Sequence, residues 1–240
     1  MAGLKRVLSL FIKEWQELVA GKLWLLLLVL SLSLAAADTV FIPPLASAQA
    51  KTAYQAVLPV WLILIIMAIC LFLTASTVAE EKAEKKLQAL LVTPLSRAEY
   101  FCAKLLFVAL LGTGCLGLTL LLTGYPADYG RVLLAGLFGT LLFAAVAIAI
   151  GIAAPNPPAA RTIATMVYLV FALPLLLKSP QSAGEGWRWL FPSNLFFCRL
   201  EHTMGSGALN GLLPVRVVPA LETIAFILCS YCFIRRRKDI

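Results

Sequence analysis

The chain has 240 residues, of which 61% are hydrophobic and only 13% are charged, and its formal net charge is +8. A mean hydropathy of +0.93, with several apolar runs long enough to cross a bilayer, indicates a membrane protein and excludes an ordinary soluble domain. The basic residues cluster at the ends of the apolar runs, which is typical of charges that set membrane topology, so we expect no nucleic-acid partner.

The cysteines and glycines predict helix packing rather than a metal or redox site. All six cysteines except Cys198 lie in or beside predicted spans, and Cys229 and Cys232 have no second pair with which to build a metal site, so we expect no bound metal. Glycines can let helices approach closely, either within the chain or between two copies. The candidates are Gly112, Gly114, Gly117, Gly136 and Gly139.

Residues 1–20 are predicted to form an amphipathic helix lying in the membrane surface. Apolar residues from Leu4 to Val19 recur at helical spacing, and polar residues fill the opposite face. The run that follows, Leu23 to Leu34, ends in three alanines and resembles a secretory signal with its cleavage site. We interpret it instead as an uncleaved first span, because the charged stretch before it is longer than 20 residues and amphipathic.

The chain is predicted to be an all-α integral membrane protein with six transmembrane helices in a single domain. A short segment within 178–213 should be re-entrant or interfacial on the extracytoplasmic side, because its apolar piece, Trp187 to Leu200, is interrupted by polar residues and too short to cross. We expect its aromatic residues, Phe196 among them, at headgroup depth. The predicted spans are 22–37, 55–78, 100–123, 132–154, 161–177 and 215–234.

Basic residues predict the orientation of the chain. The N-terminal arm, the segment 79–104, the loop from Pro155 to Arg161 and the C-terminal tail hold 14 of the 20 lysines and arginines, which leaves 6 on the other side. Because positive charge stays on the cytoplasmic side, we expect both termini in the cytoplasm of a cell with this protein in its inner or plasma membrane.

The densely charged stretch 79–98 interrupts the apolar chain. Ala83, Leu87, Leu90 and Leu91 form one stripe of an amphipathic helix whose other face is charged. The pair of Glu81 with the lysine one turn later is worth only about 0.2–0.5 kcal/mol, so we expect solvent or a protein partner to satisfy these charges.

This amphipathic helix should end sharply. Pro94 disfavours helical geometry at the residue before it, and the S-x-x-E spacing of Ser96 and Glu99 predicts a capping box that starts the next helix. Lys104, one turn inside that helix, is expected to extend back to the cytoplasmic surface. The result would be a rigid elbow that transmits force to two spans, or else a solvated connector that only caps them.

The sequence of this elbow, EEKAEKKLQALLVTPLSRAEYFCAKLL, resembles the first cytoplasmic loop of the membrane (permease) subunits of type-2 ABC exporters. Six spans and an N-terminal surface helix agree with that family over the whole length. Lys86 and Leu87 depart from the Gly-Thr that the family commonly has. The matching positions are Glu80, Glu81, Leu87, Leu90, Leu91, Thr93, Pro94, Leu95, Ser96, Arg97, Glu99 and Lys104.

The resemblance implies that 79–98 is a cytoplasmic coupling helix seated on a separate ABC ATP-binding subunit, which would bind ATP and Mg. It also implies that two permeases, either two copies of this chain or this chain with a homologue, pair among membrane lipids. The chain has no G-x-x-x-x-G-K-[ST] motif, so we expect no ATP site and no enzyme activity of its own. The predicted contacts with the ATP-binding subunit are Glu80, Glu81, Glu84, Lys85, Leu87, Leu90, Leu91, Thr93, Pro94 and Arg97.

Other functions stay open at this point. Glu222 is the one acidic residue in a predicted span and is a candidate for a substrate path or an intramembrane polar site. An ion-gradient-driven secondary transporter using Glu222, a haem-export-type permease of cytochrome c maturation and a non-transporting scaffold for an ATPase are the alternatives. Because the spans carry few charges, the favoured cargo of an exporter is hydrophobic or amphipathic, such as a drug or a lipid.

Overall fold

The computed structural model describes residues 2–20, 29, 59–84, 96–123, 128–176, 191, 193, 196, 200 and 213–236. Throughout these residues the regular structure is helical and no strand occurs. The predicted all-α class is therefore confirmed for this part of the chain.

Four helices are long and apolar enough to cross a membrane. They correspond to the predicted spans at 55–78, 100–123, 132–154 and 161–177, so these four predictions are confirmed to within a few residues. The chain is a multi-pass membrane protein. The four helices are Pro59–Ala83, Arg97–Leu122, Tyr129–Ala153 and Pro157–Leu176.

The other two predicted spans are described less fully. The first, 22–37, lies outside the described residues apart from Val29. The sixth, 215–234, falls within a helix, α10 (Leu213–Arg236), whose described apolar stretch is Thr223–Cys232. A count of six spans therefore stays a prediction.

The helix Pro59–Ala83 changes its winding near its middle. It passes through a π-helical turn, η1 (Ile69–Leu73), before returning to α-helix as α4 (Thr74–Ala83). A π-turn inserts one residue into an α-helix and rotates the side chains that follow it. The end of α4, which carries the first acidic residues of the charged stretch, is therefore not in register with the start of the span.

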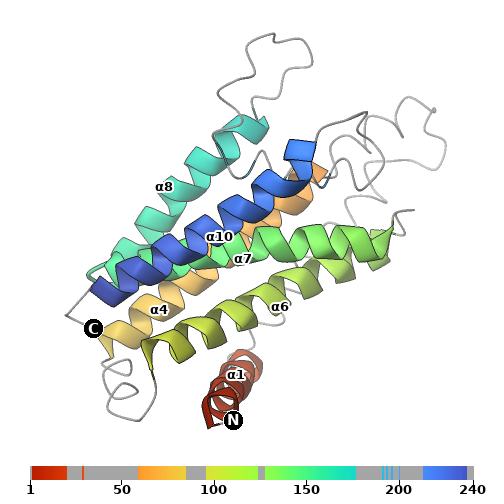
Figure 1. Cartoon of the computed structure of the whole chain (residues 1–240). Helices are drawn as coiled ribbons and strands as arrows, with labels where there is room; N and C mark the ends of the chain where they lie inside the picture. The colour runs from red at the N-terminus through yellow and green to blue at the C-terminus, as the bar shows by residue number, and fades with distance from the viewer. Residues whose placement is uncertain are drawn as a thin grey trace, which may run out of the picture.

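Helix α7 (Tyr129–Ala153) is the centre of the bundle. It packs against α4, α10, α6 (Arg97–Thr123) and α8 (Pro157–Leu176), and these helices run alongside one another in Figure 1. The N-terminal helix α1 (Ala2–Ala20), seen nearly end-on, lies across the bundle beside α6 (Figure 1). Helix α1 thus crosses the direction of the spans, as expected for a helix in the membrane surface.

Two glycines show how closely the helices approach within the chain. A Cβ atom added to Gly112 of α6 would lie 2.6 Å from Cγ2 of Thr140 on α7. One added to Gly151 of α7 would lie 2.7 Å from Cβ of Val78 and 2.8 Å from the backbone oxygen of Ala75, both on α4. Of the predicted glycine contacts, Gly112 therefore serves packing within the chain, as such positions do between membrane helices.

Parts of the predicted re-entrant segment pack into the same core. Phe196 is buried, and its ring lies 6.3 Å from that of Phe143, centroid to centroid, in an edge-on arrangement. The hydroxyl of Ser193 donates to the backbone oxygen of Phe171 on α8 at 2.7 Å. The Phe196 ring thus packs against α7, and its depth in the membrane stays a prediction.

Candidate functional site

Helix α1 is fixed to the bundle by aromatic contacts. Phe11 and Trp15 both meet Phe107 of α6 edge-on, with ring centroids 6.0 and 6.4 Å apart. Leu10 and Leu18 of α1 are buried against the bundle. Edge-on aromatic pairs of this kind add about 0.5–1.5 kcal/mol each beyond the area they bury. Helix α1 therefore docks at a defined position on α6.

A buried cluster of charges lies where α1, α4 and α6 meet. Lys104 on α6 is only 2% exposed, and its ammonium donates to both carboxylate oxygens of Glu14 on α1, each at 2.8 Å. It also donates to Oε1 of Glu81 on α4 at 2.6 Å. The hydroxyl of Tyr100 donates to the other oxygen of Glu81 at 2.5 Å. One lysine thus joins three helices.

This cluster corrects two expectations from the sequence. Lys104 does not extend to the surface, because the two carboxylates hold its ammonium inside the protein. Glu81 is 8% exposed and is satisfied by Lys104 and Tyr100, so neither solvent nor a partner is needed to satisfy it. Both expectations treated the charged stretch as an exposed surface, whereas α4 turns one of its acids toward α6.

The buried ion pairs of the cluster favour movement of α1, α4 and α6 as one unit. Removing charges from water costs several kcal/mol per ion, and that cost is offset only where partners and hydrogen bonds are all in place. Burial raises the pKa of the Glu14 carboxyl above its usual range, while the nearby Lys104 ammonium partly offsets this effect. Moving any one of the three helices away from the others would therefore leave a buried charge without its ion-pair partner.

A second set of contacts joins the end of α4 to the turn between α7 and α8. The ammonium of Lys82 donates to the backbone oxygens of Ile152 and Ala154, at 2.8 and 3.1 Å. These carbonyls lie at the C-terminal end of α7, where a positive charge is favoured by the helix dipole. Glu80 accepts from the guanidinium of Arg161 on α8 at 3.0 Å. The end of α4 is thus tied to four other helices.

The start of α6 has the predicted capping box. The backbone N–H of Ser96 donates to Oε2 of Glu99 at 2.7 Å, and the N–H of Glu99 donates to the Ser96 hydroxyl at 3.2 Å. The guanidinium of Arg6 on α1 lies 4.0 Å from Oε1 of Glu99. The predicted start of this helix is confirmed, and it too faces α1.

Only some of the predicted contacts with the ATP-binding subunit lie among the described residues. Glu80, Glu81 and Glu84 stand at the end of α4, and Arg97 is the first residue of α6. Glu222 belongs to α10, but its side chain lies outside the described part of the chain. Outside the described residues altogether are Lys85, Leu87, Leu90, Leu91, Thr93 and Pro94.

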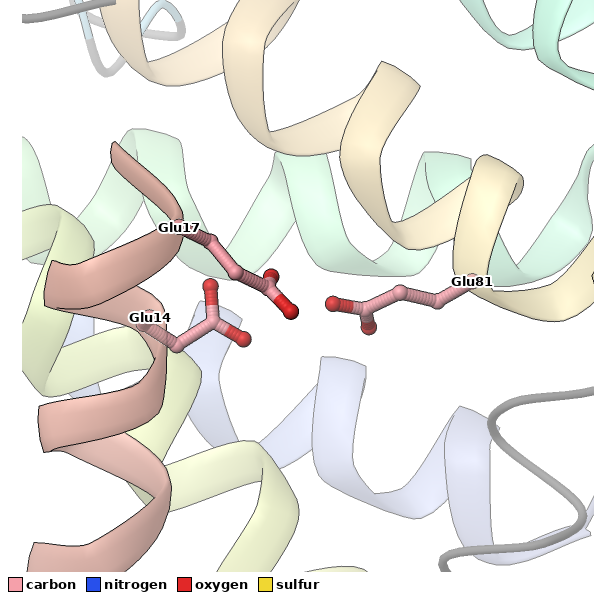
Figure 2. A group of neighbouring side chains, drawn as sticks. All are labelled: Glu14, Glu17 and Glu81. Carbon is pink, nitrogen blue, oxygen red and sulfur yellow. The ribbon is translucent and has the colours of Figure 1, made fainter. Parts of the chain in front are cut away.

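Sequence reasoning missed Glu14 and the role of Tyr100. The helical pattern of residues 1–20 places Glu14 only on the polar face of a surface helix. A signal was present in Lys104, since a lysine inside an apolar run needs a buried acid or a route to water. Figure 2 shows Glu14 and Glu17 of α1 directed at Glu81 of α4 across the junction of the helices.

Comparison with known proteins agrees with this architecture. The profile of the family described as ABC-2 family transporter protein matches residues 19–231. A search of curated proteins gives no significant match. The match covers nearly all of the chain, from the end of α1 to within α10. It describes the membrane-spanning part of a transporter and no ATPase domain, so the chain belongs to the ABC-2 family of transporter membrane proteins.

Proposed function

We propose that this chain is the permease subunit of an ATP-driven exporter and that residues 79–98 form its coupling helix on a separate ATP-binding subunit. The observation that supports this most is the convergence of contacts on both ends of that segment. Its first part belongs to α4, which Lys104, Lys82 and Arg161 tie to α1, α6, α7 and α8. Its last part begins α6, which α1 also contacts.

This convergence gives the segment a mechanical role. A force applied between residues 84 and 96 would act on the ends of two spans whose ends are joined to their neighbours by ion pairs and hydrogen bonds. Because packed helices move as rigid bodies rather than deforming continuously, such a push would tilt several helices together. ATP-driven closure of the partner subunits would thereby open a path through the permease, with ATP and Mg bound by the partner.

The remaining features of the proposal follow the family and the charge distribution. Two permeases would pair, and their cargo would be a hydrophobic or amphipathic molecule such as a drug or lipid. Both termini would be cytoplasmic, in the inner or plasma membrane, because basic residues gather at those ends. Glu222 is proposed as a polar site in α10 that contacts cargo, and transport driven by an ion gradient through it is the rival account.

The experiment is recovery of partners from the native membrane. The tagged chain is extracted in mild detergent, and its stoichiometric partners are identified by mass spectrometry. Glu84→Lys combined with Leu91→Asp should abolish recovery of an ATP-binding subunit, because it places repulsive or polar groups at two predicted contacts. Glu81 is left intact, since its loss would disturb the buried cluster instead.

The matched control is Arg131→Gln, which removes an exposed charge at the other end of α7. This variant should keep its partner. Extraction of the native chain without any ATP-binding subunit in several mild detergents would contradict the proposal and favour ion-gradient transport through Glu222.

A further inference from the structure

A buried hydroxyl directly follows the π-helical turn η1. Thr74 is 1% exposed, and its hydroxyl oxygen has no hydrogen-bond partner among the residues that the structure describes. Hydroxyls within helices can donate to a carbonyl three or four residues earlier, as Thr113 does to Ala109 at 2.7 Å. In an unbroken α-helix the hydroxyl of Thr74 would reach the carbonyl of Cys70 in the same way. Because a buried hydroxyl without a partner is unfavourable, an unbroken α-helix would suit Thr74 better than the π-helical turn does.

Conversion of η1 to α-helix would shift α4 by one residue. A π-helical turn takes up one extra residue, so each residue after it holds the place that its predecessor would hold in a continuous α-helix. Without the turn, α4 would move by about 1.5 Å along its axis and rotate by about 100° relative to the first half of the span. Each place on α4 would then be occupied by the side chain of the preceding residue. We call this arrangement the second register.

Two consecutive acids suit the buried lysine in both registers. Lys104 now donates to Glu81 at 2.6 Å, and in the second register Glu80 would occupy that place. Glu80 now pairs with Arg161 at 3.0 Å, and both of these side chains are largely exposed. An exposed pair of this kind contributes little to stability, so its loss is a small cost. Lys104 thus keeps a carboxylate of α4 as a partner in either register.

The side chains of α4 that face the bundle are small enough to exchange places. From Thr74 to Ala79 no side chain is larger than valine. Val78, which lies against Gly151 of α7, would be replaced by Thr77, a β-branched side chain of similar shape. Small residues allow membrane helices to approach closely, so α4 can pack against α7 in both registers.

The contacts at the end of α4 favour the present register. Lys82 donates to the carbonyls of Ile152 and Ala154, and the second register would turn its ammonium away and bring Glu81 toward these oxygens. A negative charge is unfavourable at the C-terminal end of a helix. The second register is therefore the less populated one, and a force along α4 would be needed to make it dominant.

We propose that the span Pro59–Ala83 is a two-register helix, in which relaxation of the π-helical turn moves α4 by one residue and exchanges Glu81 for Glu80 at Lys104. Helix register shifts occur on the microsecond to millisecond timescale. The shift is a property of this chain alone. Its use in coupling, in which a push between residues 84 and 96 drives α4 into the second register, rests on the proposed function.

The test is the reactivity of single cysteines toward a water-soluble maleimide on the isolated full chain in neutral detergent. Ala79 is 2% exposed, but in the second register it takes the place of Glu80, whose side chain is 46% exposed. Val78 is 0% exposed and moves to the buried place of Ala79. Ala79→Cys should therefore react at least several-fold faster than Val78→Cys. Equal rates would overturn the proposal, because fraying of the helix end exposes both positions.

The background for these variants carries serine in place of every cysteine except Cys70, which is fully buried. Three further substitutions, each added to Ala79→Cys, identify the acids of the two registers. Glu81→Gln should raise the rate several-fold, because only the second register then gives Lys104 a carboxylate of α4. Glu80→Gln should lower the rate several-fold. Arg161→Gln is the matched control, because it breaks the same exposed pair but keeps the acid, and it should not lower the rate.

The hydroxyl of Thr74 gives a second, independent test. Thr74→Val removes the bond that only the second register offers, so it should lower the reactivity of Ala79→Cys by about fivefold or more. Thr77→Val is its control, because the Thr77 hydroxyl already donates to the carbonyl of Thr74 at 3.1 Å. This control should change the rate less than Thr74→Val does. Equal effects of the two valine variants, or of Glu80→Gln and Arg161→Gln, would refute the two-register helix.

Discussion

Lys104 and Glu81, which stand on different helices 23 residues apart, form a buried ion pair with 2.6 Å between the ammonium nitrogen and Oε1. The carboxylate of Glu14 on α1 pairs with the same ammonium. The ends of two spans and the N-terminal helix therefore share one lysine.

Replacing Lys104 with methionine should destabilise the protein strongly. The substitution keeps the length of the side chain but leaves the carboxylates of Glu14 and Glu81 without their cation, and breaking a buried pair in this way costs about 3–5 kcal/mol. Denaturant unfolding in mixed micelles measures the loss. Adding Glu14→Gln and Glu81→Gln to Lys104→Met should recover part of it, because the unpaired charges are gone. A Lys104→Met protein as stable as the native one would contradict the role of the cluster.

The stability of the protein should depend on the protonation of Glu14. Its pKa in the folded protein lies above the ordinary value of 4.5, chiefly because of burial. Below 4.5 the carboxyl is protonated in the folded and unfolded chains alike, and its contribution is fully present. As the pH rises through the raised pKa, ionisation costs more in the folded chain, so this contribution is lost.

Glu14→Gln should therefore flatten the fall of melting temperature between mildly acidic and neutral pH. The control is Glu17→Gln, since Glu17 is more exposed and outside the Lys104 pair. Parallel melting profiles for the native protein and Glu14→Gln would show that Glu14 does not titrate as its burial requires.

Lys82 should stabilise the turn between α7 and α8. Its ammonium satisfies the carbonyls of Ile152 and Ala154, so Lys82→Met should cost about 1.5–3 kcal/mol, the range for hydrogen bonds to charged groups. Faster amide hydrogen exchange at the end of α7 would report the loss locally. Arg161→Gln breaks only an exposed pair and should cost less than about 1 kcal/mol. Equal effects of the two substitutions would argue against a capping role for Lys82.

Two glycines give a matched test of the packing. Gly151→Ala should destabilise by about 1–3 kcal/mol, because its new methyl group would meet a backbone oxygen that cannot move independently. Gly114→Ala meets nothing within 4 Å and should be neutral or stabilising by up to about 1 kcal/mol, as alanine favours the helix. Thermal unfolding of both variants in the same detergent compares them. A destabilised Gly114→Ala would mean that this face of α6 is covered by a neighbour.

Much of the fold follows from hydropathy and local signals. Four spans and the capping box at Ser96 and Glu99 are predictable because apolar length and S-x-x-E spacing are properties of short stretches. The position of α1 on the bundle cannot be predicted in this way. Its helical period can be read from the sequence, but its docking depends on Phe107, which lies far along the chain.

The charge cluster depends on relations that no single stretch contains. Lys104 alone predicts either a buried acid or a path to the surface, and only the placement of α4 beside α6 selects Glu81. The π-helical turn at Ile69–Leu73 also hides the cluster from sequence analysis, because it rotates α4 relative to the first half of its span. Simple helical periodicity from the start of that span therefore places the later residues on the wrong faces.

Pro94, which is predicted to end the coupling helix, should be needed for coupling. Pro94→Ala permits helical geometry at Thr93 and should let the predicted helix continue into α6, which would raise ATP hydrolysis without transport in a reconstituted complex. The readout is the ratio of cargo moved to ATP hydrolysed, with Arg131→Gln as the control. An unchanged ratio would mean that the break between the helices has no part in coupling.

The proposed function requires that the segment between α4 and α6 contacts an ATP-binding subunit, and cross-linking in the native membrane detects that contact. A photo-reactive amino acid is placed at position 91, and in a parallel variant at position 121 near the opposite end of α6, where Leu121 is exposed. Position 91 should capture an ATP-binding subunit, and position 121 should not. Capture from both positions or from neither would contradict it.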